Sequence, residues 1–290
     1  MDPRKKALLF RRLTPYLLLL PTAVYMLVFV GYPIAETVRL AFTDPDTGAI
    51  GLFNYEVLAQ DFHFWEALRY TFLLAGVIIP IQVALALGVS ILLMRKFKGS
   101  GAVLYTFLIP LTISDVAAAL IWYNILTDSG FLNRLLLNLG LITRPLHFFG
   151  YQYRDMEFLA IVTTEVWRAT AIVFVIVFAG FQMIGKDYLE AADVFGASQW
   201  EKFRYVIFPM VKPSLQTALI IRTLFAMQVF AVVWILAGRD IPVLAGETYY
   251  WQVELKNPNV AAAYALIIAV ISLALGFLYL KLFKPKYLEG

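Results

Sequence analysis

The sequence predicts an all-α membrane protein, and three observations support this fold class. Of its 290 residues, 61% are hydrophobic and only 15% are charged, whereas soluble domains carry about 25% charged residues. Several windows are apolar over the roughly 20 residues that a helix needs to cross a bilayer. The basic residues are concentrated in alternate connections between these windows, as they are in the cytoplasmic loops of membrane proteins.

The windows predict six transmembrane helices in a single domain that covers residues 1–290. The predicted spans are about 14–38, 68–94, 103–126, 158–184, 214–236 and 260–282. The first has the basic start of a signal peptide, but it is too long and lacks a small-residue cleavage site, so it is predicted to be retained. Pro80 and Pro110 predict weak kinks in the second and third spans.

The connections between the spans differ in character. Residues 42–65, after the first span, include acidic residues and no Lys or Arg. Residues 131–142, after the third span, have leucines at helical spacing, which predicts a short helix in the outer interface or an ordered loop. Residues 185–213, after the fourth span, hold both acidic and basic residues.

The Lys and Arg residues predict the orientation of the chain. Both termini and the connections after the second and fourth spans together hold about three times as many of them as the opposite side does, which predicts cytoplasmic termini. The connection after the fourth span contributes Lys186, Lys202, Arg204 and Lys212. The net charge of +4 therefore reflects membrane topology, and no nucleic-acid partner is predicted.

Residues typical of catalytic and metal sites are scarce. The chain has no cysteine and two histidines. Because His63 and His147 lie far apart without Cys or Glu at ligand spacing, no metal site is predicted. The sequence has no glycine-rich loop of the G-x-x-x-x-G-K-[ST] type, and the nearest stretch, "RKFKGSGA" at 95–102, is too short. The chain is therefore predicted to be no enzyme, with no catalytic residue.

A polar stretch, "EAADVFGASQWEKFRYVIFPMVKP" at 190–213, interrupts an otherwise apolar sequence. It predicts two short helices, one over 188–195 with Asp187 as its N-cap and one over 199–207, with Gly196 ending the first. The two prolines near its end are predicted to stop the second helix and redirect the chain into the fifth span. On periodicity alone, an amphipathic connector resting on the inner leaflet would be the preferred interpretation of the stretch.

The spacing inside this stretch is more specific than its periodicity. Glu-Ala-Ala is followed by three residues, a glycine, nine residues and Val-Ile-Phe-Pro. This pattern resembles the cytoplasmic signature loop of permease subunits of binding-protein-dependent ABC importers. The residues that fall on the motif are Glu190, Ala191, Ala192, Gly196 and Pro209. Val206 and Phe208 replace the usual isoleucine and leucine.

Three other stretches resemble the carbohydrate-uptake branch of that family, so that the resemblance covers nearly the whole chain. They are "GYPIAETVRLAFT", "ALIWYNILTDSGFLNRLLLNLGLI" and "VWRATAIVFVIVFAGFQMIGKDYLEAA". The resemblance implies a subunit that moves a sugar, such as the disaccharides maltose and trehalose, from an external binding protein to the cytoplasm by alternating access.

The resemblance also implies partners. A coupling helix around Glu190 would dock on a homodimeric cytoplasmic ABC ATPase that binds ATP and Mg, since this chain binds no cofactor itself. The other partners would be a second, different permease chain and an extracytoplasmic sugar-binding protein or lipoprotein, in the cytoplasmic membrane of a bacterium or archaeon. One alternative is a permease of the same family for a non-sugar or anionic solute such as a phosphorylated polyol. Others are a secondary transporter, which often has inverted repeats, and a channel subunit.

Polar residues within the predicted spans are candidates for the substrate path, because ionisable groups in a membrane are costly. These residues are Asp115, Asn124, Glu165, Arg168, Arg222 and Gln228. The nearby aromatic residues that could contact sugar rings are Trp122, Tyr123, Trp167 and Trp234. A structural role is the alternative, in which the two acidic residues pair with the two arginines inside the bundle. Unpaired arginines would instead suit a phosphate or carboxylate group.

Overall fold

The computed structural model describes residues 3–95 and 97–282, and these residues are helical apart from connections and one isolated bridge between Thr43 and Ile50. The predicted cytoplasmic tail at 283–290 lies outside the described residues. The elements in chain order are α1 (Pro3–Met26), η1 (Leu27–Gly31), α2 (Tyr32–Ala41), α3 (Phe53–Gln60), α4 (Phe62–Met94), α5 (Ser100–Leu108), η2 (Ile109–Thr112), α6 (Asp115–Leu126), α7 (Phe131–Asn138), η3 (Tyr151–Tyr153), α8 (Arg154–Gln182), α9 (Lys186–Val194), α10 (Gln199–Glu201), η4 (Lys202–Ile207), α11 (Phe208–Met227), α12 (Ala231–Leu236), α13 (Leu244–Tyr249), η5 (Tyr250–Glu254) and α14 (Pro258–Leu282). The all-α prediction is confirmed for this part of the chain.

Four described helices are long and apolar enough to cross a membrane. They are Leu13–Ala41, Phe62–Met94, Tyr151–Gln182 and Pro258–Leu282. A fifth candidate is the pair Ser100–Thr112 and Asp115–Asn138, which is bent by 106°. The count of six spans therefore stays a prediction.

Two of the predicted spans are interrupted rather than continuous. In the window 103–126, the helix tightens into η2 at Pro110 and a new helix starts after Ser114, whose hydroxyl accepts a hydrogen bond from the Ala117 amide at 3.2 Å. Proline removes a helical hydrogen bond and serine caps helix starts, so the weak kink predicted at Pro110 is a full break. The window 214–236 is split into α11 and α12.

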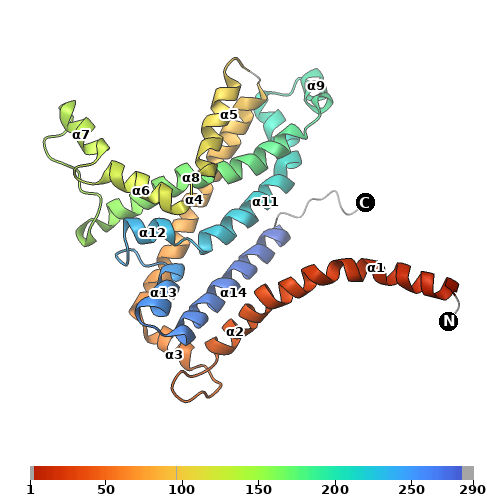
Figure 1. The fold of residues 1–290 in the computed structure, drawn as a ribbon. Helices are drawn as coiled ribbons and strands as arrows, with labels where there is room; N and C mark the ends of the chain where they lie inside the picture. Colours follow the sequence, from red (N-terminus) through yellow and green to blue (C-terminus); the bar gives the residue numbers. More distant parts are fainter. Residues whose placement is uncertain (1–2, 96, 283–290) are drawn as a thin grey trace.

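The core is built around α4, α8 and α11, which pack against one another. Helix α14 packs against α2, α11 and α13, while α12 packs against α6 and α8. Helices α8 and α11 approach closely at Gly180, where an added Cβ would lie 2.6 Å from the Cβ of Ser214. Figure 1 shows α9 and the turn before α5 at one end of this bundle and α3 at the opposite end.

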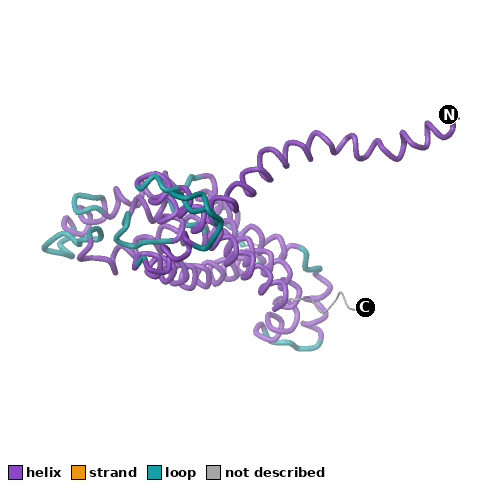
Figure 2. Tube along the Cα trace, turned by 90° about the horizontal axis from the view of Figure 1, so that it is seen from below, coloured by secondary structure: helices purple, strands orange, loops and turns teal. Residues whose placement is uncertain are grey.

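The first helix projects away from the bundle, as Figures 1 and 2 both show. No residue in the apolar window of Leu13–Ala41 is buried. A continuous apolar surface of this length is not stable in water, so this helix needs lipid or another protein chain around it.

The predicted short helix after the third span is confirmed as α7, but two details of the polar segment were predicted wrongly. Asp187 is not an N-cap, because α9 begins at Lys186 and leaves Asp187 in the first turn, where a carboxylate is favoured by the helix dipole. The two prolines do not stop the second helix. Pro209 lies in the first turn of α11, where proline is tolerated, and Pro213 lies inside it.

Candidate functional site

A polar pocket lies where α6, α8 and α11 meet, and five of the six residues predicted for the substrate path line it. Its volume is about 280 Å³. Its walls are formed by Leu111, Asp115, Glu165, Arg168, Ala169, Ile172, Arg222, Phe225, Gln228 and Val229. Asn124 is the exception, because it lies farther along α6 and its side-chain amide donates to the Leu120 carbonyl of its own helix at 2.7 Å.

The two helix interruptions border this pocket. Leu111 belongs to η2 and Asp115 is the first residue of α6, whereas Gln228 and Val229 lie between α11 and α12. Ends of helices leave main-chain amides and carbonyls without helical partners, and broken helices are a common feature of transporter binding sites. The pocket therefore combines polar side chains with the ends of broken helices.

The two most buried charges of the pocket are paired with each other. The Arg222 guanidinium donates to Glu165 Oε2 at 2.7 Å and to Gln82 Oε1 at 2.6 Å. Gln82 Nε2 in turn donates to the Glu165 carbonyl at 2.8 Å. Glu165 is 1% exposed and Arg222 is 2% exposed. These three residues, here called the Glu165 clamp, join α4, α8 and α11, so the predicted structural pairing is present.

The second arginine is also paired. Arg168 Nη1 lies 2.8 Å from Asp115 Oδ1 and its Nη2 lies 3.2 Å from Glu165 Oε1. Two carboxylates and two guanidinium groups thus form one connected network whose formal charges cancel. An anionic solute would be suited by unpaired arginines in the cavity, and both arginines of this pocket are paired.

The aromatic candidates pack against other rings. Trp122 and Trp167 contact each other edge to face at 6.1 Å, and Tyr123 stacks on Phe149 at 4.9 Å. Trp234 contacts Phe230 and Tyr249. These four candidates, all in the described part of the chain, are absent from the pocket wall.

Two residues of the site, Phe225 and Gln82, were not predicted from the sequence. Phe225 is the aromatic residue on the pocket wall, and 57% of it is exposed. It lies three residues after Arg222 on α11, so the two side chains lie near one face of that helix, and it lies three residues before Gln228. Gln82 was missed because it is one polar residue inside a long apolar window.

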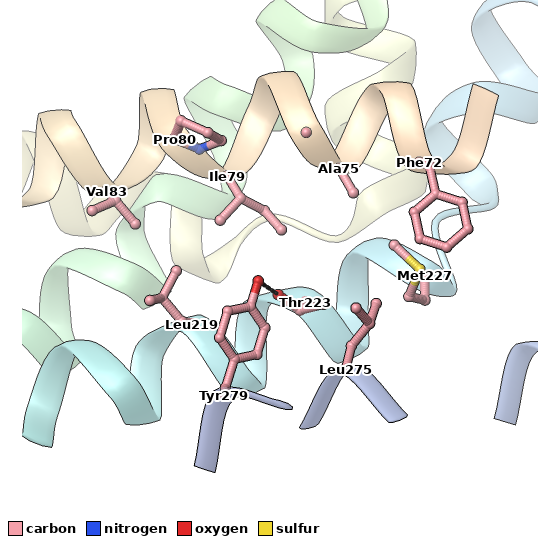
Figure 3. Close-up of a pocket in the computed structure, with 11 residues that line it drawn as sticks. Phe72, Ala75, Ile79, Pro80, Val83, Leu219, Thr223, Met227, Leu275 and Tyr279 are labelled. Atoms are coloured by element: carbon pink, nitrogen blue, oxygen red, sulfur yellow. Dashed lines mark hydrogen bonds between the residues drawn. The ribbon is translucent and has the colours of Figure 1, made fainter. Parts of the chain in front are cut away.

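A second pocket of about 340 Å³ lies on the other side of α11 and has a different chemical character. Figure 3 shows its mostly apolar lining from α4, α11 and α14, with a hydrogen bond of 3.1 Å between the hydroxyl groups of Thr223 and Tyr279. None of the predicted substrate-path residues lines it. The polar pocket is smaller, but its lining is the one suited to a hydroxylated solute.

The predicted docking residues gather on and around α9, at one end of the bundle (Figure 1). Glu190 and Ala191 are exposed, whereas Ala192 is buried. Gly196 has φ of +75°, a conformation that glycine adopts without strain. It ends α9 in a Schellman motif, in which the Ala197 amide donates to the Ala192 carbonyl and the Gly196 amide to the Asp193 carbonyl. Pro209 follows at the start of α11.

A capping box starts the helix after this turn. The Ser198 hydroxyl accepts a hydrogen bond from the Glu201 amide, and the Glu201 carboxylate accepts from the Ser198 amide at 2.8 Å. The pKa of the Glu201 carboxyl is lowered because the hydroxyl and amide of Ser198 bond to its ionised form. The S-x-x-E spacing of this motif is visible in the sequence and is a typical signal for a helix start.

Comparisons with known proteins agree with this architecture. Residues 82–286 match the family described as "Binding-protein-dependent transport system inner membrane component". The chain is 30% identical to the trehalose transport system permease protein SugA of Mycobacterium tuberculosis, over 94% of this chain and 89% of that protein. It is 29% identical to the trehalose/maltose transport system permease protein MalF of Thermococcus litoralis, over 92% of each.

A solved structure has a similar fold. It is a chain of a bacterial ABC transporter involved in the import of the acidic polysaccharide alginate, with a TM-score of 0.82 and 22% identity. The match covers 97% of this chain and 98% of that chain.

Proposed function

Since the chain belongs to the family of binding-protein-dependent transport system inner membrane components, we propose that it is the transmembrane subunit of an ATP-driven importer for a neutral sugar. Trehalose and maltose are the proposed solutes, because they are named in the descriptions of similar permeases. The sugar would pass from an external binding protein through the polar pocket to the cytoplasm.

The observation that carries this proposal is the internally neutralised polar pocket. A sugar needs hydrogen-bonding groups and an apolar ring surface, and it gains nothing from an unpaired charge. On the pocket wall, Gln228 supplies hydrogen-bonding groups and the exposed ring of Phe225 supplies an apolar surface. The arginines are held by carboxylates, which does not favour the alternative of an anionic solute.

The proposed mechanism links this pocket to ATP hydrolysis in another subunit. A homodimeric cytoplasmic ATPase would bind ATP and Mg and receive α9 in a surface cleft. Ala191 would allow close approach, while Glu190 would meet a basic group of the ATPase. Closure of the ATPase dimer would move α9, and the helices connected to it would turn the pocket from one side of the membrane to the other.

The proposed assembly has two permease chains, the second different from this one, in a bacterial or archaeal inner membrane. A crystal structure similar in fold holds a periplasmic protein bound to an alginate pentasaccharide, and we propose an equivalent sugar-binding protein here. The six spans and the cytoplasmic position of both termini belong to the same proposal. The spans rest on the apolar windows of the sequence, and the position of the termini rests on its distribution of Lys and Arg.

Reconstituted uptake tests the proposal. The full complex in proteoliposomes should accumulate radiolabelled trehalose or maltose only with ATP and binding protein, and should not accumulate glycerol phosphate. The variant Gln228→Ala should lower uptake of the sugar while leaving assembly intact, because its side chain lies at a helix interruption rather than inside the Glu165 clamp. Uptake of glycerol phosphate in preference to both sugars would refute the neutral-sugar assignment.

A further inference from the structure

The connection between α9 and α11 is held at several points. The Schellman motif at Gly196 fixes the end of α9, and the capping box between Ser198 and Glu201 fixes the next helical turn. Two residues, Phe195 and Ala197, complete the turn around the glycine. The hydrogen bonds on both sides leave this short connection little freedom to bend.

An ion pair connects α9 to η4, the helical segment that follows the turn and α10. Lys202 Nζ donates to Asp193 Oδ1 across the turn. Lysine is rarely buried, yet Lys202 is only 8% exposed. A buried ammonium is costly unless a carboxylate compensates it, so Asp193 is the group that makes this position of Lys202 favourable. The side chain of Asp193 is 61% exposed, so the pair lies at the surface of the turn, with the lysine covered and the carboxylate facing solvent.

The lysine begins a rod that reaches the polar pocket. It is the first residue of η4, a π-helical turn that continues into α11 without a non-helical residue between them. The 20 residues of α11 span about 30 Å at the usual rise of a helix. Arg222 and Gln228 lie at the far end of this rod. The pair Asp193–Lys202 therefore joins α9 directly to the helix that forms one wall of the pocket.

We propose that Asp193 and Lys202 are positioning residues for transport, which lock α9 to the rod formed by α10, η4 and α11. A displacement of α9 by the ATPase then moves the pocket wall instead of flexing the connection. Neither residue touches the solute or ATP in this scheme. The inference rests on the proposed function, because it assumes that α9 receives the movement of the ATPase.

The experiment separates coupling from assembly. In the purified full complex, Asp193→Asn removes the partner of the buried lysine, and the double variant Asp193→Asn with Lys202→Met removes both charges while keeping an apolar stem. For each, we would measure the yield of complex, trehalose uptake per ATP hydrolysed, and hydrogen exchange over residues 186–207. Glu36→Gln is the control, because it breaks an ion pair between exposed residues of α2.

Both test variants should lower uptake per ATP by about fivefold or more, the lower end of ordinary coupling between sites, and should speed exchange over 186–207. The double variant should assemble at normal yield, and the control should match the original protein in all three measurements. Unchanged exchange or unchanged uptake per ATP in the double variant would overturn the inference. Absence of ATP-dependent uptake by the unmodified complex would refute the proposed function, while the exchange measurement would still decide the role of the pair.

Discussion

Replacing Glu165 with glutamine tests whether the Glu165 clamp is structural. The change keeps the shape of the side chain but leaves Arg222, 2% exposed, without a negative partner. Breaking a buried ion pair in this way costs about 3–5 kcal/mol, since the remaining charge is uncompensated. Neutral hydrogen bonds inside membrane bundles average about 0.6 kcal/mol, so the amide recovers only a small part. We expect a loss of stability of about 3 kcal/mol.

A matched variant is available on the same helix. Glu157 is also 1% exposed, but it accepts a hydrogen bond from the Gly150 amide at 2.7 Å and makes no ion pair with any residue that the structure describes. Glu157→Gln therefore removes an uncompensated charge and should cost less than 1 kcal/mol by the same reasoning.

The stabilities of the two variants are compared by heating the detergent-extracted complex and measuring how much intact complex remains. The clamp is refuted as a structural element if Glu165→Gln is as stable as the original protein. Equal losses for Glu165→Gln and Glu157→Gln would also contradict the argument, because only the first leaves an arginine unpaired. Normal stability together with lost uptake would instead assign Glu165 to the solute.

Three further predictions concern the helix contact, the topology and the turn. Gly180→Ala should lower stability by about 1–3 kcal/mol through overpacking against Ser214, whereas Gly88→Ala, with no atom within 4 Å of its added Cβ, should be neutral in the same unfolding assay. A cysteine at Gln199 should react with thiol reagents only from the cytoplasmic side, and labelling of intact cells by an impermeant reagent would contradict the topology. Gly196→Val should abolish assembly with the ATPase or transport while membrane insertion persists, because a β-branched residue is strained at φ of +75°; normal uptake with normal ATPase stimulation would argue against the docking role.

The fold class and the polar residues of the pocket could be predicted from the sequence, because both follow from the contrast between lipid and water as surroundings. An apolar window of about 20 residues can be satisfied only as a helix in lipid, and a charge inside such a window must find a partner or a ligand. Asp115, Glu165 and Arg222 could be identified because they are charged residues inside apolar windows. What stayed open was their pairing, since Glu165 and Arg222 are far apart along the chain.

The interruptions of the helices were harder to predict than their presence. Hydropathy does not distinguish a continuous span from two shorter helices, and the window 103–126 is apolar on both sides of its break. The signals were a proline followed by a serine with N-cap character, Pro110 and Ser114, and they are weak because both residues occur within ordinary membrane helices. The split after Met227 has no proline or glycine at all, so nothing in local propensity indicated it.

Two fixed points on the same pair of helices restrict how the bundle can move. At one end of the contact, Gly180 and Ser214 approach too closely to admit a methyl group, and toward the middle Glu165 holds Arg222 at 2.7 Å. Sliding α8 along α11 would have to break the ion pair and force the small residues apart together. The lower-cost movement is one in which α8 and α11 stay together as a body. We expect the changes in backbone angle to fall on the residues between α11 and α12 and on those between η2 and α6, which lie at the border of the polar pocket.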